Sequence, residues 1–146
     1  RNIWLNVHTR HYGERDGQYT ERLLECIAQS GRADQIVLAC FADQAERAKA
    51  RLPQISICNM TAQGHAGTDY PEKTIELGAD FLQLFGWHER TGEAVALLHQ
   101  HGIKVNYFKA DDPEEIARLL DLGVDFVLTD RLDEALAAWR RWSGEQ

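Results

Sequence analysis

Short apolar runs alternate along this sequence with longer amphipathic stretches. Runs rich in β-branched and aromatic residues predict strands, and they lie at residues 3–7, 36–41, 55–58, 81–85, 105–108 and 126–128. The stretches between them repeat apolar residues at helical spacing, and they predict helices at residues 19–29, 43–52, 71–78, 91–101, 112–123 and from 130 onward. Strands and helices that alternate in this way predict a parallel sheet with helices packed outside it.

The last third of the chain has the clearest boundaries. Asp112 offers an N-cap oxygen, Pro113 stands at the first helical position, and Gly123 can take the left-handed angles of a helix end. The continuous apolar run at 126–128 predicts a strand buried on both faces. Asp130 is expected to cap the last helix, as Thr91 is expected to cap an earlier one. This segment therefore predicts two parallel strands joined by a crossover helix.

An internal echo supports repeated βα units. Residues 77–82 read LGADFL and residues 122–127 read LGVDFV, a spacing of 45 residues. Each copy places a glycine helix stop directly before a predicted strand. The match is short, and convergence on a good helix stop explains it equally well.

Composition narrows the function classes. A chain of 146 residues with 44% hydrophobic residues predicts one folded domain. The net charge of -7 disfavours a nucleic-acid partner, and no apolar run approaches the length of a membrane span. Cys26, Cys40 and Cys58 form an odd set without a CxxC pair, which favours reduced thiols and a cytoplasmic location. The first residue, Arg1, leaves a removed leader or a trimmed N-terminus open.

The last third, GIKVNYFKADDPEEIARLLDLGVDFVLTDRLDEAL, resembles the C-terminal end of the glycerophosphodiester phosphodiesterase family. The seventh strand of that family ends in an aromatic residue, followed by a short turn and a helix that starts with Pro. Its eighth strand carries a Gly-x-Asp apolar run and then Thr-Asp, here Gly123, Asp125, Thr129 and Asp130. The stretches IWLNVHTR, IVLACFADQAERAKARLPQISICN and GADFLQLF resemble earlier strands of the family.

The resemblance implies an α/β fold like a TIM barrel. It implies one domain over residues 1–146, with six parallel βα units and without the family's first two, so that the barrel is incomplete or truncated. Members of the family hydrolyse glycerophosphodiesters with a divalent metal, Mg²⁺ or Ca²⁺. Their His-Arg-Gly motif, their paired metal carboxylates and their second catalytic histidine belong to the units before residue 3. The chain alone is therefore expected to be inactive or very weak.

The resemblance also assigns candidate binding residues. Phe41 and Phe108 stand at family aromatic positions, and Phe108 would wall the substrate pocket. Arg10 stands at a family lysine and can hold phosphate through its two-pronged guanidinium, while Lys109 adds positive charge nearby. His8 takes the place of a metal-binding glutamate. Hard cations prefer oxygen ligands, so His8 disfavours Mg²⁺ or Ca²⁺ and leaves zinc or manganese possible.

The chemistry of such a fold lies at the carboxyl ends of its strands. The polar, aromatic and sulfur-bearing residues expected there are His8, Arg10, His11, Cys40, Phe41, Asn59, Gln83, Phe85, Trp87, His88, Phe108, Lys109, Asp111 and Asp130. Each also has a simpler interpretation as a solvated loop residue or a packing residue. Trp87, for example, could cover a site or pack on a neighbouring element.

Three functions stay open from the sequence. The chain could be part of an active hydrolase, a binding protein for a small phosphorylated ligand or glycerophosphodiester through Arg10 and Lys109, or an assembly unit. The first and last predicted strands would both be sheet edges, with Trp4, Trp139 and Trp142 near them. Open edges of this kind predict a homo-oligomer.

Overall fold

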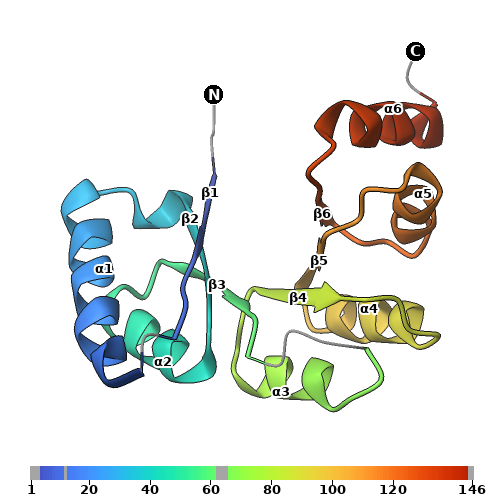
Figure 1. Ribbon diagram of the computed structural model, residues 1–146. Helices are drawn as coiled ribbons and strands as arrows, with labels where there is room; N and C mark the ends of the chain where they lie inside the picture. Colours follow the sequence, from blue (N-terminus) through green and yellow to red (C-terminus); the bar gives the residue numbers. More distant parts are fainter. Residues whose placement is uncertain (1–3, 12, 62–65, 145–146) are drawn as a thin grey trace. The chain divides into compact units, whose positions relative to one another are not determined.

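The computed structural model describes residues 4–11, 13–61 and 66–144, and it divides into two compact units, residues 1–61 and 62–146 (Figure 1). Each of the six strands is followed by a helix, and the strand pairs inside each unit are parallel. The predicted α/β class with six parallel βα units is confirmed. Ile3, predicted to open the first strand, and His65, predicted to lie in a loop, fall outside the described residues.

The first unit contains three strands and two long helices. In chain order its elements are β1 (Leu5–His8), the short 3₁₀ helix η1 (Gly13–Arg15), α1 (Asp16–Ser30), η2 (Ala33–Gln35), β2 (Ile36–Cys40), α2 (Ala42–Arg51) and β3 (Ser56–Asn59). β1 pairs with β2 and β2 with β3, so that His8, Ala39 and Cys58 lie in one row across the strands. The carboxyl ends of the three strands therefore share one edge of this unit.

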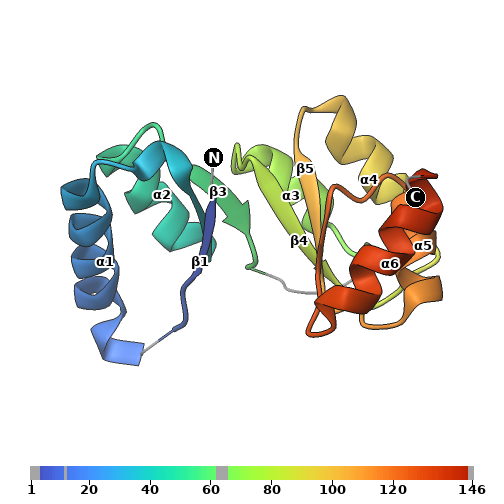
Figure 2. The same cartoon turned by 90° about the horizontal axis from the view of Figure 1, so that it is seen from above.

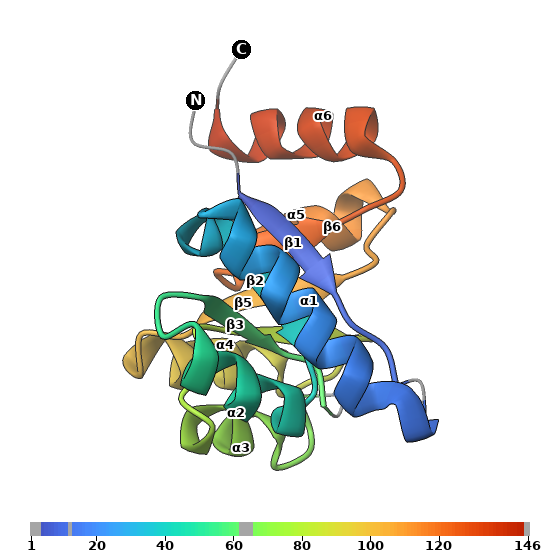
Figure 3. The same cartoon turned by 90° about the vertical axis from the view of Figure 1, so that its left-hand side faces the viewer.

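Helix α1 is amphipathic and packs against the strands of its unit. It buries Thr20, Leu24 and Ile27, which lie on one face, and Figure 3 shows the helix lying along β1 and β2. Gly31 ends it in the left-handed region, at a φ of 64°. The helix begins three residues before the predicted start, because η1 leads directly into it.

The second unit repeats the alternation. Its elements are α3 (Tyr70–Glu76), β4 (Phe81–Phe85), α4 (Thr91–Gln100), β5 (Lys104–Phe108), α5 (Pro113–Asp121), β6 (Phe126–Leu128) and α6 (Leu132–Ser143). β5 pairs with β4 on one side and with β6 on the other. Figures 1 and 2 both show α5 and α6 side by side.

Side chains along the strands of the second unit alternate between two faces of the sheet, and one of these faces forms the core. Leu82, Leu84, Val105 and Tyr107 join one buried cluster with helix residues that include Leu98, Ile116 and Leu119. The intervening residues point to the opposite face, because successive side chains of a strand alternate. Gln83 therefore lies beside Asn106, and Phe85 beside Phe108, on the face away from these helices.

The helix boundaries of the second unit follow the predicted local signals in most places. Oδ1 of Asp112 accepts the N–H groups of Glu114 and Glu115, both at 2.9 Å, so the predicted N-cap of α5 is confirmed. Gly78 and Gly123 both have left-handed φ values, 64° and 84°. The two copies of the internal echo therefore form the same type of helix end, each before a strand.

Three local predictions are wrong. β6 is not buried on both faces, since the Phe126 side chain is 49% exposed; inside this unit β6 is an edge strand that pairs with β5 alone. Asp130 does not cap α6, because the turn continues to Arg131 before the helix starts and no side chain caps it. Thr91 is the first residue of α4, and its hydroxyl donates to the carbonyl of His88 at 2.7 Å, outside the helix.

Several large apolar side chains are exposed. They are Trp4 and Leu5 in the first unit, and Phe85, Trp87, Phe126, Leu132, Leu136, Trp139 and Trp142 in the second. Cys26, Cys40 and Cys58 are not joined to one another by a disulfide. Among the described residues, the helices are all too short or too polar to cross a bilayer.

Candidate functional site

The candidate residues gather at the carboxyl ends of the strands in each unit. In the first unit His8 ends β1, Arg10 lies two residues beyond it, and Phe41 follows β2 directly. In the second unit Phe108 ends β5 and Lys109 follows it. The structure thus places every candidate binding residue where a parallel α/β fold carries its chemistry, and each unit has its own cluster.

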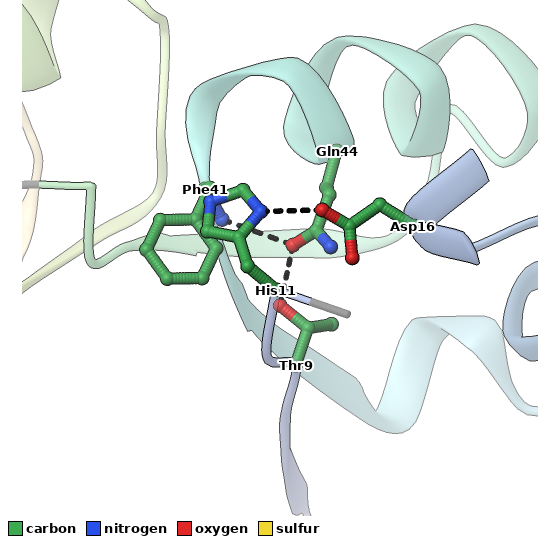
Figure 4. A network of polar contacts seen from close by, with 5 residues as sticks. All are labelled: Thr9, His11, Asp16, Phe41 and Gln44. Carbon is green, nitrogen blue, oxygen red and sulfur yellow. Dashed lines mark hydrogen bonds and ion pairs between the residues drawn. The ribbon is translucent and has the colours of Figure 1, made fainter. Parts of the chain in front are cut away.

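A buried polar contact holds the segment after β1 in the first unit (Figure 4). The hydroxyl of Thr9 donates to Oε1 of Gln44 at 2.5 Å and to the carbonyl of Ala39 at 3.3 Å. Oε1 of Gln44 also accepts the N–H of Phe41 at 3.3 Å. Thr9 and Gln44 are both almost fully buried. The segment that carries Arg10 is therefore fixed to β2 and to the first turn of α2.

A second contact holds the same segment from its other side. The ring of His11 stacks on Phe41, with 3.8 Å between centroids and 33° between planes, and Figure 4 shows the two rings facing each other. Nδ1 of His11 lies 2.8 Å from Oδ2 of Asp16, at the start of α1. His11 thus covers one face of Phe41, the aromatic side chain expected in the substrate pocket.

Arg10 lies between these two anchored residues and remains exposed. Its guanidinium makes no hydrogen bond or ion pair with another residue in the described ranges. Thr9 and His11, its direct neighbours, are both held in place. A fixed backbone with a solvated guanidinium can bind an anion without first breaking an internal ion pair.

Two titratable groups near the ends of β1 and β2 are kept neutral by their surroundings. Partial burial lowers the pKa of His8, which favours the neutral imidazole near pH 7. Burial, helped by the neighbouring Cys58 and Asp43, raises the pKa of Cys40 to about 12. The Cys40 thiol therefore stays protonated and is a poor nucleophile.

The side chains at the strand ends can be compared with those that the divalent metal of the family would need. Mg²⁺ and Ca²⁺ require several oxygen ligands, and carboxylates usually supply the charge. The side chain at the end of β1 is an imidazole, and across residues 4–11, 13–61 and 66–144 no three His, Cys, Asp or Glu side chains gather closely enough to hold an ion. The side chains described here do not fit a hard divalent cation.

Two phenylalanines form an apolar wall at the strand ends of the second unit. Phe85 and Phe108 have ring centroids 5.6 Å apart and planes at 49°, and Phe85 is 46% exposed. Tyr107 points the other way and donates its hydroxyl to Glu115 at 3.3 Å. Burial and this carboxylate raise the pKa of Tyr107 to about 12. Tyr107 is thus a protonated core residue, whereas Phe108 lies beside Phe85 on the opposite face of the sheet.

Lys109 follows this wall with an unusual backbone. Its φ is 63°, in the left-handed region, and its ammonium lies 3.5 Å from Oδ2 of Asp130. Both side chains are mostly exposed, so the pair contributes little energy and can open for a ligand.

Oδ1 of Asp111 accepts the N–H of Asp130 at 2.9 Å and the hydroxyl of Thr129 at 2.8 Å, and these bonds lower the pKa of Asp111.

Trp87 packs on a neighbouring helix. The Arg118 guanidinium of α5 lies 4.9 Å from its ring centroid. Of the two interpretations left open by the sequence, packing on a neighbour is therefore the one observed.

Sequence reasoning missed the contacts that hold the two clusters. Thr9 lies between two candidate residues but points to the opposite side, and its partner Gln44 is 35 residues away. No local pattern connects such a pair. Asp111 and Thr129 were each noted separately, and only the pairing of β5 with β6 brings them together.

Six βα units with parallel strands in each unit agree with an incomplete TIM barrel. The family model for the glycerophosphoryl diester phosphodiesterase family matches residues 6–134 of this sequence, and the chain belongs to that family. A search among curated proteins found no match.

Solved structures agree with this assignment at the level of the fold. A protein of Silicibacter pomeroyi, provisionally named a glycerophosphoryl diester phosphodiesterase, aligns with a TM-score of 0.81 at 17% identity over 96% of this chain and 51% of its own. A glycerophosphodiester phosphodiesterase of Parabacteroides distasonis gives 0.63 at 18% identity over 93% and 56%. A 3-hexulose-6-phosphate synthase gives 0.65 at 16% identity over 96% and 73%. The chain spans about half the length of the first two.

Proposed function

We propose that this chain binds a small phosphodiester of the glycerophosphodiester class, or the matching phosphate monoester, at the carboxyl ends of its strands. Membership of the phosphodiesterase family supports the proposal. The observation that carries it is the arrangement at the end of β5, where the exposed Lys109 ammonium follows the Phe85–Phe108 wall. A cation beside an apolar surface suits a ligand that has a phosphate and a carbon-rich alcohol.

Arg10 provides a second cation for phosphate in the first unit. Its backbone neighbours are anchored, and its guanidinium can donate two parallel hydrogen bonds to phosphate oxygens. Phe41 and His11 lie beside it as a stacked pair and offer ring edges to the alcohol part of a ligand.

Hydrolysis of such a diester would release glycerol 3-phosphate and an alcohol. It needs a water activated by a base and an acid for the leaving alcohol. Three of the groups near the strand ends are poorly suited to these roles, because Cys40 and Tyr107 stay protonated and Asp111 already accepts two hydrogen bonds. We infer that this sequence by itself binds the ligand without detectable turnover.

A direct test combines calorimetry with an activity assay. Titration of sn-glycerol 3-phosphate and of glycerophosphocholine should give measurable heats of binding to the full chain. Choline release from glycerophosphocholine should stay at background, with or without added Mg²⁺ or Ca²⁺. Metal-dependent turnover that survives His8→Ala would show that the site has been placed wrongly.

A second candidate function is assembly, and exposed apolar side chains favour it. Trp4 and Leu5 are each 55% exposed at the edge of the first unit, and Phe126 is 49% exposed on β6. Edge strands with unpaired backbone groups and apolar side chains invite another chain. We therefore propose a homo-oligomer, located in a reducing cytoplasm, which the odd set of cysteines without a CxxC pair favours. Light scattering at micromolar concentration tests it, and a stable monomer would contradict it.

A further inference from the structure

One carboxylate joins two turns at the strand ends of the second unit. Oδ1 of Asp111, in the turn after β5, accepts the hydroxyl of Thr129 at 2.8 Å and the N–H of Asp130 at 2.9 Å. The Thr129 hydroxyl oxygen in turn accepts the N–H of Arg131 at 3.0 Å. The turn after β5 is thus tied to the turn after β6 by side chains that stand 18 positions apart.

The hydrogen bonds of Asp111 lie two residues after a residue with a strained backbone, Lys109. Among the described residues, Lys109 is the only one other than glycine with a left-handed φ. For such a residue this conformation costs roughly 1–2 kcal/mol, so its surroundings must enforce it. Phe108 pairs with Leu128 on one side of Lys109, and the N–H of Ala110 donates to the carbonyl of Leu128 at 3.1 Å on the other. Asp111, the residue after Ala110, holds the same turn through its contacts with Thr129 and Asp130.

Helix capping does not account for Asp111. The next residue, Asp112, already caps α5 through the N–H groups of Glu114 and Glu115. The two adjacent aspartates therefore have separate tasks, one at the helix and one between the turns. This pair of neighbours offers a matched control within the chain.

The negative charge of Asp111 does not itself favour the binding of phosphate. Its carboxylate is ionised near neutral pH, since the ordinary pKa of 3.8 already lies well below pH 7, and the Asp130 N–H, the Thr129 hydroxyl and the nearby cations lower the pKa further. A negative charge close to a phosphate site repels the phosphate. Any benefit of Asp111 to phosphate binding must therefore come from geometry.

We propose that Asp111 is a positioning residue for phosphate recognition by Lys109, acting through Thr129 and the backbone of Asp130. The contacts fix the turn after β5, so that the Lys109 ammonium starts from one defined backbone position instead of many. Fixing a binding group in advance improves affinity by removing part of the ordering cost. This inference rests on the proposed phosphate-binding function of Lys109.

The test measures sn-glycerol 3-phosphate affinity of the full chain by calorimetry. Asp111→Ala and Thr129→Val should each weaken binding by roughly two- to fivefold, which does not exceed the loss expected when Lys109 itself is removed. Asp111→Asn keeps the acceptor oxygen and removes the charge, so it should bind as tightly as the native chain or more tightly. Thr129→Ser keeps the hydroxyl and should also preserve affinity. Asp112→Ala should lower thermal stability and leave affinity unchanged.

The outcomes separate this inference from the function on which it rests. If Lys109→Ala does not weaken binding, Lys109 holds no phosphate and both proposals fail. If Lys109→Ala weakens binding while Asp111→Ala and Thr129→Val do not, only the positioning role is overturned. Equal losses in Asp111→Ala and Asp111→Asn would also overturn it, because the acceptor oxygen that Asn retains would then have no effect on affinity. If Asp111→Ala does not fold, the comparison of Thr129→Val with Thr129→Ser decides.

Discussion

The strand-end clusters of the two units hold an exposed cation in different ways. In the first unit the residues on either side of Arg10 are anchored, Thr9 by a buried neutral amide and His11 by a ring contact and a carboxylate. In the second unit Lys109 itself has a strained backbone, and the carboxylate of Asp111, two residues further on, holds the turn that contains it. The first arrangement depends on burial and the second on loop-to-loop hydrogen bonds, so they should respond differently to mutation.

The largest expected effect is on stability, from the buried amide of the first unit. Gln44→Ala removes the acceptor for Thr9 and for the Phe41 N–H and leaves a cavity. We expect a loss of about 2–3 kcal/mol in the free energy of unfolding, measured with urea. Gln29→Ala, an exposed glutamine on α1, is the control and should change stability little. A loss below about 0.5 kcal/mol would mean that this contact does not hold the segment.

The next effect is on affinity in the first unit. Arg10→Ala should weaken phosphate binding by roughly 1–3 kcal/mol, because a charge-assisted hydrogen bond is lost. Arg22→Ala removes another exposed arginine of the same unit, on α1, and serves as the control. Unchanged affinity in Arg10→Ala, measured by calorimetry, would mean that Arg10 is a solvated loop residue that does not bind phosphate.

Lys109→Ala should have a smaller effect, about 1 kcal/mol in phosphate affinity, because the ammonium is exposed and partly screened. The same strand supplies the control. Lys104 stands at the amino end of β5, on the side away from the candidate site, so Lys104→Ala should leave affinity unchanged. Equal losses in both variants would indicate a general charge effect and remove the distinction between the two strand ends.

The smallest expected effect is the pH dependence of stability through Asp111. The hydrogen bonds from Asp130 and Thr129 lower its pKa in the folded protein below the ordinary value of 3.8. Its contribution is therefore fully present above that ordinary value and is lost as pH falls through the folded pKa. Urea midpoints should fall more steeply on acidification below about pH 4 in the native chain than in Asp111→Asn. Parallel profiles would show that Asp111 is not held in its ionised form by these contacts.

The sequence predicted what local signals control. Strand positions agree within one or two residues, and the helix boundaries at Asp112 and Gly123 follow from short-range geometry. The two copies of the internal echo form the same helix end, yet Phe81 is half-buried in a strand and Phe126 is largely exposed. Local sequence decides the turn in both copies, whereas the neighbouring strands decide how much of each side chain is covered.

The candidate site was harder to predict for a related reason. The positions of Arg10 and Lys109 follow from strand order, because the carboxyl ends of parallel strands share an edge. The contacts that hold them join residues 18 and 35 positions apart, and they arise only after the strands have paired. The prediction that Asp130 caps α6 was wrong because the helix starts only at Leu132, which leaves Arg131 at the N-cap position.

The central claim is that phosphate binds at the carboxyl ends of the strands, and backbone NMR tests it most directly. Addition of sn-glycerol 3-phosphate to the labelled native chain should shift the amide signals of residues 9–11 and 108–111. Signals of Lys104, at the opposite end of β5, and of α6 should stay in place. Saturable shifts confined to the two strand-end clusters are the predicted result. An unchanged spectrum, or shifts that avoid both clusters, would contradict the account.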